Sequence, residues 1–93
     1  MVHIQVLVSD PKNLSPVAQA ALQHVEAAAG RFPGQVDVMV VGLMDLAAVE
    51  RGIGREPAVL VEELVIAVGQ APPAGHLVRA IEAALQRKQA DNV

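Results

Sequence analysis

The chain of 93 residues contains no cysteine, tryptophan or tyrosine, and Phe32 is its one aromatic residue. Without cysteine, the protein has no disulfide, no thiolate nucleophile and no dithiol for redox exchange. Without aromatic side chains, it lacks the stacking platforms on which single-stranded nucleic acids and many nucleotides bind. These absences exclude thiol chemistry and disfavour recognition by stacking.

Basic residues are also scarce, because seven Lys and Arg face ten Asp and Glu, for a formal net charge of −3. A phosphate backbone is bound by a basic surface, so we expect no nucleic-acid partner. No apolar run has membrane-spanning length, and the first residues do not resemble a signal peptide. We therefore expect no membrane partner and a cytoplasmic location. His3, His24 and His76 lack the spacing of zinc ligands, so no metal or other cofactor is expected.

Aliphatic residues and alanine are abundant, and hydrophobic residues make up 53% of the chain. A chain of this length forms one domain with a single core. No linker or repeat divides the sequence, so we assign residues 1–89 to that domain. Residues 90–93 are expected to be a frayed tail.

A β-hairpin is the clearest local pattern. Two apolar runs rich in β-branched residues, Ala58–Val61 and Leu64–Val68, are separated only by Glu62 and Glu63. A two-residue gap between such runs is typical of a tight hairpin. Pro57 precedes the first run, where its missing N–H removes no hydrogen bond from the sheet.

The first helix is predicted from its start signals. Ser15 suits the N-cap, and Pro16 suits the first helical position, where an N–H is not needed. Gly30 would end the helix. The expected core-facing residues are Val17, Ala21, Val25 and Ala28.

The whole pattern predicts an α/β fold with a four-stranded mixed sheet and helices on both faces. The expected strands are Val2–Val8, 35–41, Ala58–Val61 and Leu64–Val68, and the expected helices are Pro16–Ala29, 46–51 and 74–89. The first two strands, joined by a helix, should be parallel.

Residues of the hairpin region also carry a family resemblance. They are Glu56-Pro57-Ala58-Val59-Leu60-Val61, the later Gly69 and the Pro72-Pro73 pair. Together with the order of elements, they resemble the thioredoxin fold and the small thioredoxin-like family of redox-active disulfide proteins. That family has a Thr-Pro-Ala-Leu-Val segment, a following Gly and a proline at the start of the last helix. The resemblance implies a cis peptide bond before Pro57.

The loop after the first strand departs from this family, which carries a Cys-x-x-Cys motif there. This chain reads Ser-Asp-Pro-Lys-Asn over residues 9–13, so Asp10 and Asn13 stand where the two cysteines would be. Thiol–disulfide exchange requires a thiolate. The resemblance therefore implies a redox-inactive member without cysteine.

We expect the polar groups near this loop to form a binding site at one end of the molecule. The candidate binding residues are Asp10, Lys12, Asn13, Arg55, Glu56 and Pro57. The favoured function is a protein-binding module, an adaptor or assembly factor, that uses loop 9–16 and Pro57. No residue is assigned a catalytic role, because no nucleophile is paired with a base.

Three alternatives stay open for this sequence. Asp10, Lys12 or Glu56 could serve as polar groups for a small molecule or thiol compound, with or without catalysis. The chain could be a self-associating structural domain, a homodimer formed through the edge strand Leu64–Val68 or a thinly covered sheet face. The charged loop could also be only a solvated turn.

Overall fold

A four-stranded mixed sheet is the central layer of the protein, whose computed structural model describes residues 1–42 and 57–91. The strands are β1 (Val2–Val8), β2 (Val36–Gly42), β3 (Ala58–Val61) and β4 (Leu64–Val68), and their order in the sheet is β2-β1-β3-β4. β1 is parallel to β2 and antiparallel to β3, and β3 and β4 form an antiparallel hairpin. The predicted mixed sheet, parallel first pair and hairpin are confirmed.

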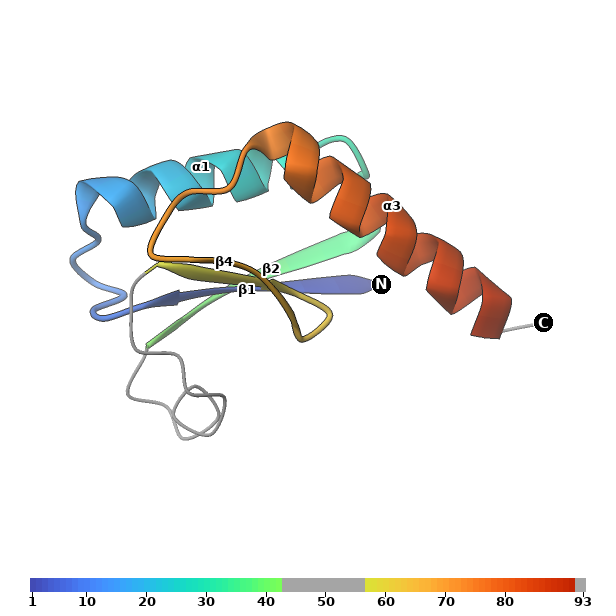
Figure 1. Ribbon diagram of the computed structural model, residues 1–93, viewed down its shortest axis with the longest axis horizontal. Coiled ribbons are helices and arrows are strands. Elements are labelled where there is room, and N and C mark those ends of the chain that lie inside the picture. Colours follow the sequence, from blue (N-terminus) through green and yellow to red (C-terminus); the bar gives the residue numbers. More distant parts are fainter. Residues whose placement is uncertain (43–56, 92–93) are drawn as a thin grey trace.

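Both described helices lie on one face of this sheet (Figure 1). They are α1 (Pro16–Ala29) and α3 (Ala74–Asp91). α3 therefore continues into the segment that we expected to be a frayed tail. The helix expected over 46–51, which would cover the second face of the sheet, lies outside the described residues. Among the described residues, no helix combines the length and apolar character needed to cross a membrane.

The main core fills the space between the helices and the sheet. Alternate residues of β1 supply one side of it, because successive side chains of a strand point to opposite faces. Its buried members are Val2, Ile4, Val6, Val8, Ala18, Ala21, Val25, Ala28, Val59, Val61, Leu77, Ile81 and Ala84. The large share of alanine lets α1 approach the sheet closely.

The core-facing side of α1 differs from the prediction at one residue. Val17 is 46% exposed, whereas its neighbour Ala18 is fully buried. Buried positions 18, 21, 25 and 28 follow a spacing of three and four residues. Val17 precedes this stripe by one residue, which corresponds to a rotation of about 100° around the helix. A β-branched residue thus lies exposed near the start of α1.

The second face of the sheet carries a smaller apolar cluster. Leu7, Ala58 and Leu60 are buried there, and Val41 packs against them. Towards the start of β1 this face becomes polar, where His3 Nδ1 lies 3.5 Å from Asp37 Oδ2. The sheet therefore has one fully apolar face and one divided face.

Candidate functional site

The loop of residues 9–15 and Pro57 lie at the same end of the sheet, which we call the loop end. β1 leads into the loop after Val8, and the antiparallel register pairs Leu7 with Ala58. Pro57 consequently lies opposite the last residue of β1. The structure thus brings the loop with Asp10, Lys12 and Asn13 to the same end as Pro57, from segments far apart in the sequence. Arg55, Glu56 and the predicted cis bond before Pro57 lie outside the described residues.

Asp10 organises the loop backbone. Its Oδ1 accepts a hydrogen bond from the Lys12 N–H at 3.0 Å, and its carbonyl accepts one from the Asn13 N–H at 3.1 Å. A side-chain bond to the N–H two residues on is an Asx turn. The Asp10 carboxylate is therefore partly engaged in holding the loop, which a role as a free acid or base would not need.

Pro11 of the loop lies close to the end of the neighbouring strand β2. A Cβ added at Gly42, the last residue of β2, would lie 3.7 Å from the Pro11 Cγ, at van der Waals distance. The bare Gly42 backbone and the proline ring are thus neighbours. The loop therefore lies close to the end of β2 as well as to the end of β1.

The start of α1 completes the loop. The Ser15 Oγ accepts a hydrogen bond from the Ala18 N–H at 3.2 Å, as predicted for an N-cap. The Gln19 Nε2 also donates to the Leu14 carbonyl at 3.1 Å. With its backbone held at both ends, the loop leaves Lys12 and Asn13 exposed.

Pro57 has a different environment from the rest of the site. Its side chain is fully buried, and its carbonyl accepts a hydrogen bond from the Gly69 N–H at 2.7 Å. Gly69 has a φ of 76°, a conformation that glycine adopts at little cost. Pro57 therefore shapes the loop end from inside, whereas Lys12 and Asn13 lie exposed at the same end.

The loop end offers hydrogen-bonding groups but no assembled acid–base pair among its described residues. The Ser15 hydroxyl caps α1. Two of the histidines are engaged elsewhere: His24 Nδ1 lies 2.8 Å from the Pro72 carbonyl oxygen, and His3 faces Asp37. Residues 1–42 and 57–91 also contain no group of three potential metal ligands.

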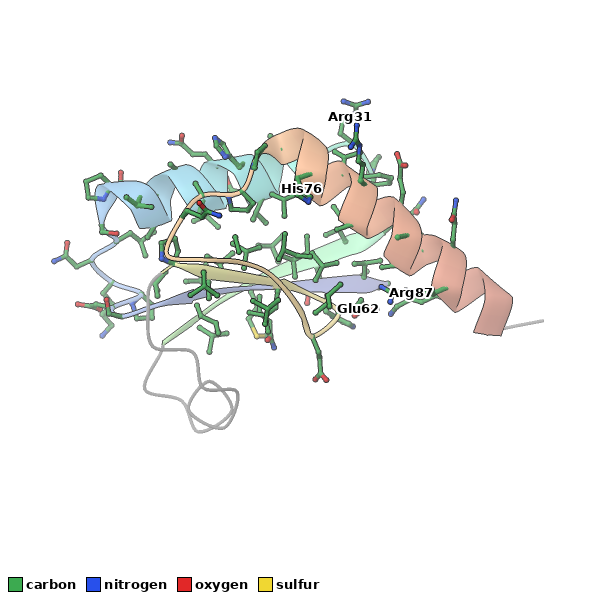
Figure 2. All side chains as sticks on the ribbon, viewed as in Figure 1. Arg31, Glu62, His76 and Arg87 are labelled. Atoms are coloured by element: carbon green, nitrogen blue, oxygen red, sulfur yellow. The ribbon has the colours of Figure 1, made fainter. Side chains whose placement is uncertain are left out.

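A second polar cluster, which the sequence pattern did not reveal, lies at the opposite end of the sheet. We call it the hairpin end; Glu62 of the β3–β4 turn lies there beside α3 (Figure 2). The Glu62 carboxylate forms an ion pair with Lys88 and accepts a hydrogen bond from the His3 N–H at 3.3 Å. Lys88 also donates to the Met1 carbonyl. Three distant segments of the chain meet at this one carboxylate.

The electrostatics of Glu62 follow from these contacts. Partial burial by itself would raise the pKa of the Glu62 carboxyl group. Hydrogen bonds from Lys88 and the His3 backbone, with the positive charges of Lys88 and His3, outweigh that effect and lower the pKa below its ordinary value. The Glu62 carboxylate is therefore charged and stabilises the fold. The spacing between residues 62 and 88 in the sequence did not predict this ion pair.

Comparison with known proteins adds no family to this picture. No protein-family model matches the chain, and no curated protein matches it significantly. The functional argument therefore depends on the residues and the geometry described above.

Proposed function

We propose that this protein is a redox-inactive, thioredoxin-like module that binds a protein partner through its loop end. The proposal is supported by the order of the described elements: a parallel β-α-β unit, an antiparallel hairpin and a final helix. In this proposal the chain has the scaffold of the thioredoxin-like family that its sequence resembles, and the absence of cysteine leaves it without that family's redox groups. An adaptor or assembly factor needs only the scaffold.

The observation that carries the proposal is the held loop with exposed side chains. Asp10 and Ser15 fix the backbone on both sides of Lys12 and Asn13, so little conformational freedom is lost when a partner binds. Val17, 46% exposed, adds apolar area at the start of α1, where this loop ends. An apolar residue next to a few polar ones is the usual composition of a protein-binding surface.

Affinity capture from extract of the native cell tests this function. The bait is the tagged protein, compared with a Lys12→Ala, Asn13→Ala double variant whose loop backbone bonds remain. We expect a specific protein to be enriched by the unchanged chain and lost from the variant. Binding of the purified partner should then weaken about tenfold or more, as expected when a charge-assisted hydrogen bond is removed.

The matched control is a Gln23→Ala, Arg87→Ala double variant, which removes one amide and one cation from exposed sites on α1 and α3. It should capture the same protein as the unchanged chain. Equal capture by the loop variant, or loss in both variants, would reject the loop end as the docking surface.

A second candidate function, homodimerisation, is favoured by the edge strand β4. Leu64, Val65 and Val68 are 56%, 44% and 41% exposed, and the strand from residue 64 to 68 contains no charge and no proline. Natural edge strands usually carry charged residues or proline, which prevent pairing with another chain. Pairing of β4 with β4 of a second copy would extend the sheet and cover these side chains.

Molecular mass in solution, measured by sedimentation over a range of protein concentrations, tests this second candidate. The unchanged chain should have the mass of a dimer, and Val65→Lys should return it to a monomer. Val17→Lys, at a similarly exposed position on α1, is the control and should remain dimeric. A monomeric mass for the unchanged chain at high concentration would reject the homodimer.

A further inference from the structure

A groove lies between the C-terminal end of α1 and the N-terminal end of α3, away from the loop end. Its volume is about 500 Å³, and it is open to solvent. Its lining residues are Ala27, Ala28, Arg31, Ala74, Gly75, Val78, Arg79 and Glu82. Alanine, glycine and valine predominate, so the surface between the charged side chains is mainly apolar.

Two exposed arginines give the groove its charge. Arg31 follows α1 and extends away from the sheet (Figure 2), and Arg79 lies on α3. Both are exposed, and neither guanidinium group forms an ion pair or hydrogen bond within the described parts of the chain. This surface is basic in a protein whose formal net charge is −3, although Glu82 also lines it.

We propose that this groove binds an acidic peptide segment of a partner protein. Guanidinium groups bind carboxylates through two parallel hydrogen bonds, a geometry that a lysine cannot provide. Carboxylates of the peptide would pair with Arg31 and Arg79, and small apolar side chains between them would lie on Ala27 and Gly75. An open groove favours a peptide, since small molecules are usually enclosed over most of their surface.

The groove and the loop end are separate sites. α1 has 14 residues and is therefore about 21 Å long, with Ser15 at one end and Arg31 just past the other. One partner could contact both sites only by following α1. The peptide site therefore does not depend on the function proposed for the loop end.

Nuclear magnetic resonance titration of the ¹⁵N-labelled protein tests the proposal. The probe is the peptide acetyl-Glu-Ala-Leu-Glu-Ala-Leu-amide, and the matched probe has Gln in place of both Glu residues. The expected result is a set of amide shifts confined to the C-terminal end of α1 and the first turns of α3, at least tenfold weaker binding of the Gln peptide and a decrease with added salt. Equal binding of the two peptides would overturn the proposal.

A charge variant and its control lie on the same helix. Arg79→Gln should weaken binding of the Glu peptide about tenfold, because one charge-assisted pair is lost. Arg87→Gln removes the same charge from an exposed site outside the groove and should leave binding unchanged. Equal weakening by both variants would show attraction by net charge alone and would overturn a specific site.

A steric variant tests the groove independently of charge. A Cβ added at Gly75 would meet no atom within 4 Å, so Gly75→Leu can occupy the groove without displacing the core. Leucine also favours a helix more than glycine does. Thermal unfolding should be unchanged or shifted upwards, while peptide binding is lost. Peptide binding retained by Gly75→Leu would overturn the peptide proposal. Amide shifts with hexanoate equal to those with the peptide would also overturn it, and so would shifts at the groove that appear when the protein concentration alone is raised.

Discussion

The two ends of the sheet are held by opposite kinds of contact. Within the loop of residues 9–15 at the loop end, the side-chain bonds join near neighbours: Asp10 with the N–H two residues on, and Ser15 with the N–H three residues on. At the hairpin end, Glu62 binds the N–H of a residue 59 positions away. The loop end can therefore form its turn from its own sequence, whereas the hairpin end requires the assembled fold.

The two ends also differ in which residues have a backbone with positive φ. Beside the loop end, the residue with positive φ is Gly69, for which this conformation carries little strain. At the hairpin end, Glu62 and Glu63 have φ values of 50° and 71°. Tight hairpin turns require positive φ but usually place Asn, Asp or Gly there. The hairpin end thus retains backbone strain, and its long-range contacts offset that strain.

The largest effect is expected for Glu62→Ala. The variant keeps a side chain with a Cβ, and therefore the strain, but removes the ion pair with Lys88 and the bond from the His3 N–H. We expect the free energy of unfolding to fall by about 1.5 kcal/mol, a moderate value because Lys88 is partly exposed. Urea unfolding followed by circular dichroism measures the change.

Glu62→Gly separates strain from contact at the same position. Glycine relieves the positive φ, a gain of about 1 kcal/mol that should leave this variant clearly more stable than Glu62→Ala. If the two variants were equally stable, backbone strain at Glu62 would be negligible. The two ends would then differ only in how far apart in the sequence their bonded residues lie.

Local signals in the sequence predicted most of the fold. The bounds of β1, α1, β3 and β4 agree with the structure. α1 was marked by its N-cap and proline, and β3 and β4 were marked by Pro57 and the two-residue turn. Val17 was misplaced because helical periodicity alone left the core-facing stripe uncertain by one position, and burial of Ala18 resolves it. The larger apolar side chain of Val17 favoured its assignment to the core. The close packing of α1 on the sheet instead buries the smaller Ala18.

The candidate site was predictable only where local bonds form it. The positions of Asp10, Lys12 and Asn13 followed from the end of β1, and the capping role of Ser15 was explicit. The Glu62–Lys88 pair and the two groove arginines had no such signal. Their proximity depends on how α3 crosses the sheet and α1, which a single sequence does not encode in a short motif.

Ser15→Ala is expected to have the next largest effect, at the loop end. It removes the acceptor for the Ala18 N–H and should lower the free energy of unfolding by about 1 kcal/mol. Ser15→Asp retains a capping oxygen and should remain close to the unchanged protein. A loss in Ser15→Asp equal to that in Ser15→Ala would mean that the hydroxyl has another role.

A smaller effect is expected for Asp10→Ala, which removes the bond to the Lys12 N–H in an exposed turn. We expect the free energy of unfolding to fall by about 0.5 kcal/mol, the lower limit for a hydrogen bond open to water. Amide hydrogen exchange should increase at Lys12 and Asn13 and remain unchanged at the hairpin end. Asp10→Asn keeps the acceptor oxygen and should restore protection; faster exchange at both ends would show that they are coupled.

The smallest effect is a pH dependence confined to the hairpin end. The pKa of Glu62 is lowered from its ordinary value of 4.5, so between the folded and unfolded pKa values the unfolded chain binds more protons than the folded chain. The stabilisation is complete above 4.5 and is lost as the pH falls through the lower folded value. Glu62→Gln has no such titration, so the stability difference between it and the unchanged protein should shrink on acidification. Urea unfolding of both proteins at matched pH values measures this difference. If it were constant or grew in acid, the contacts of Lys88 and His3 would not favour the charged form of the Glu62 carboxyl group over the neutral form.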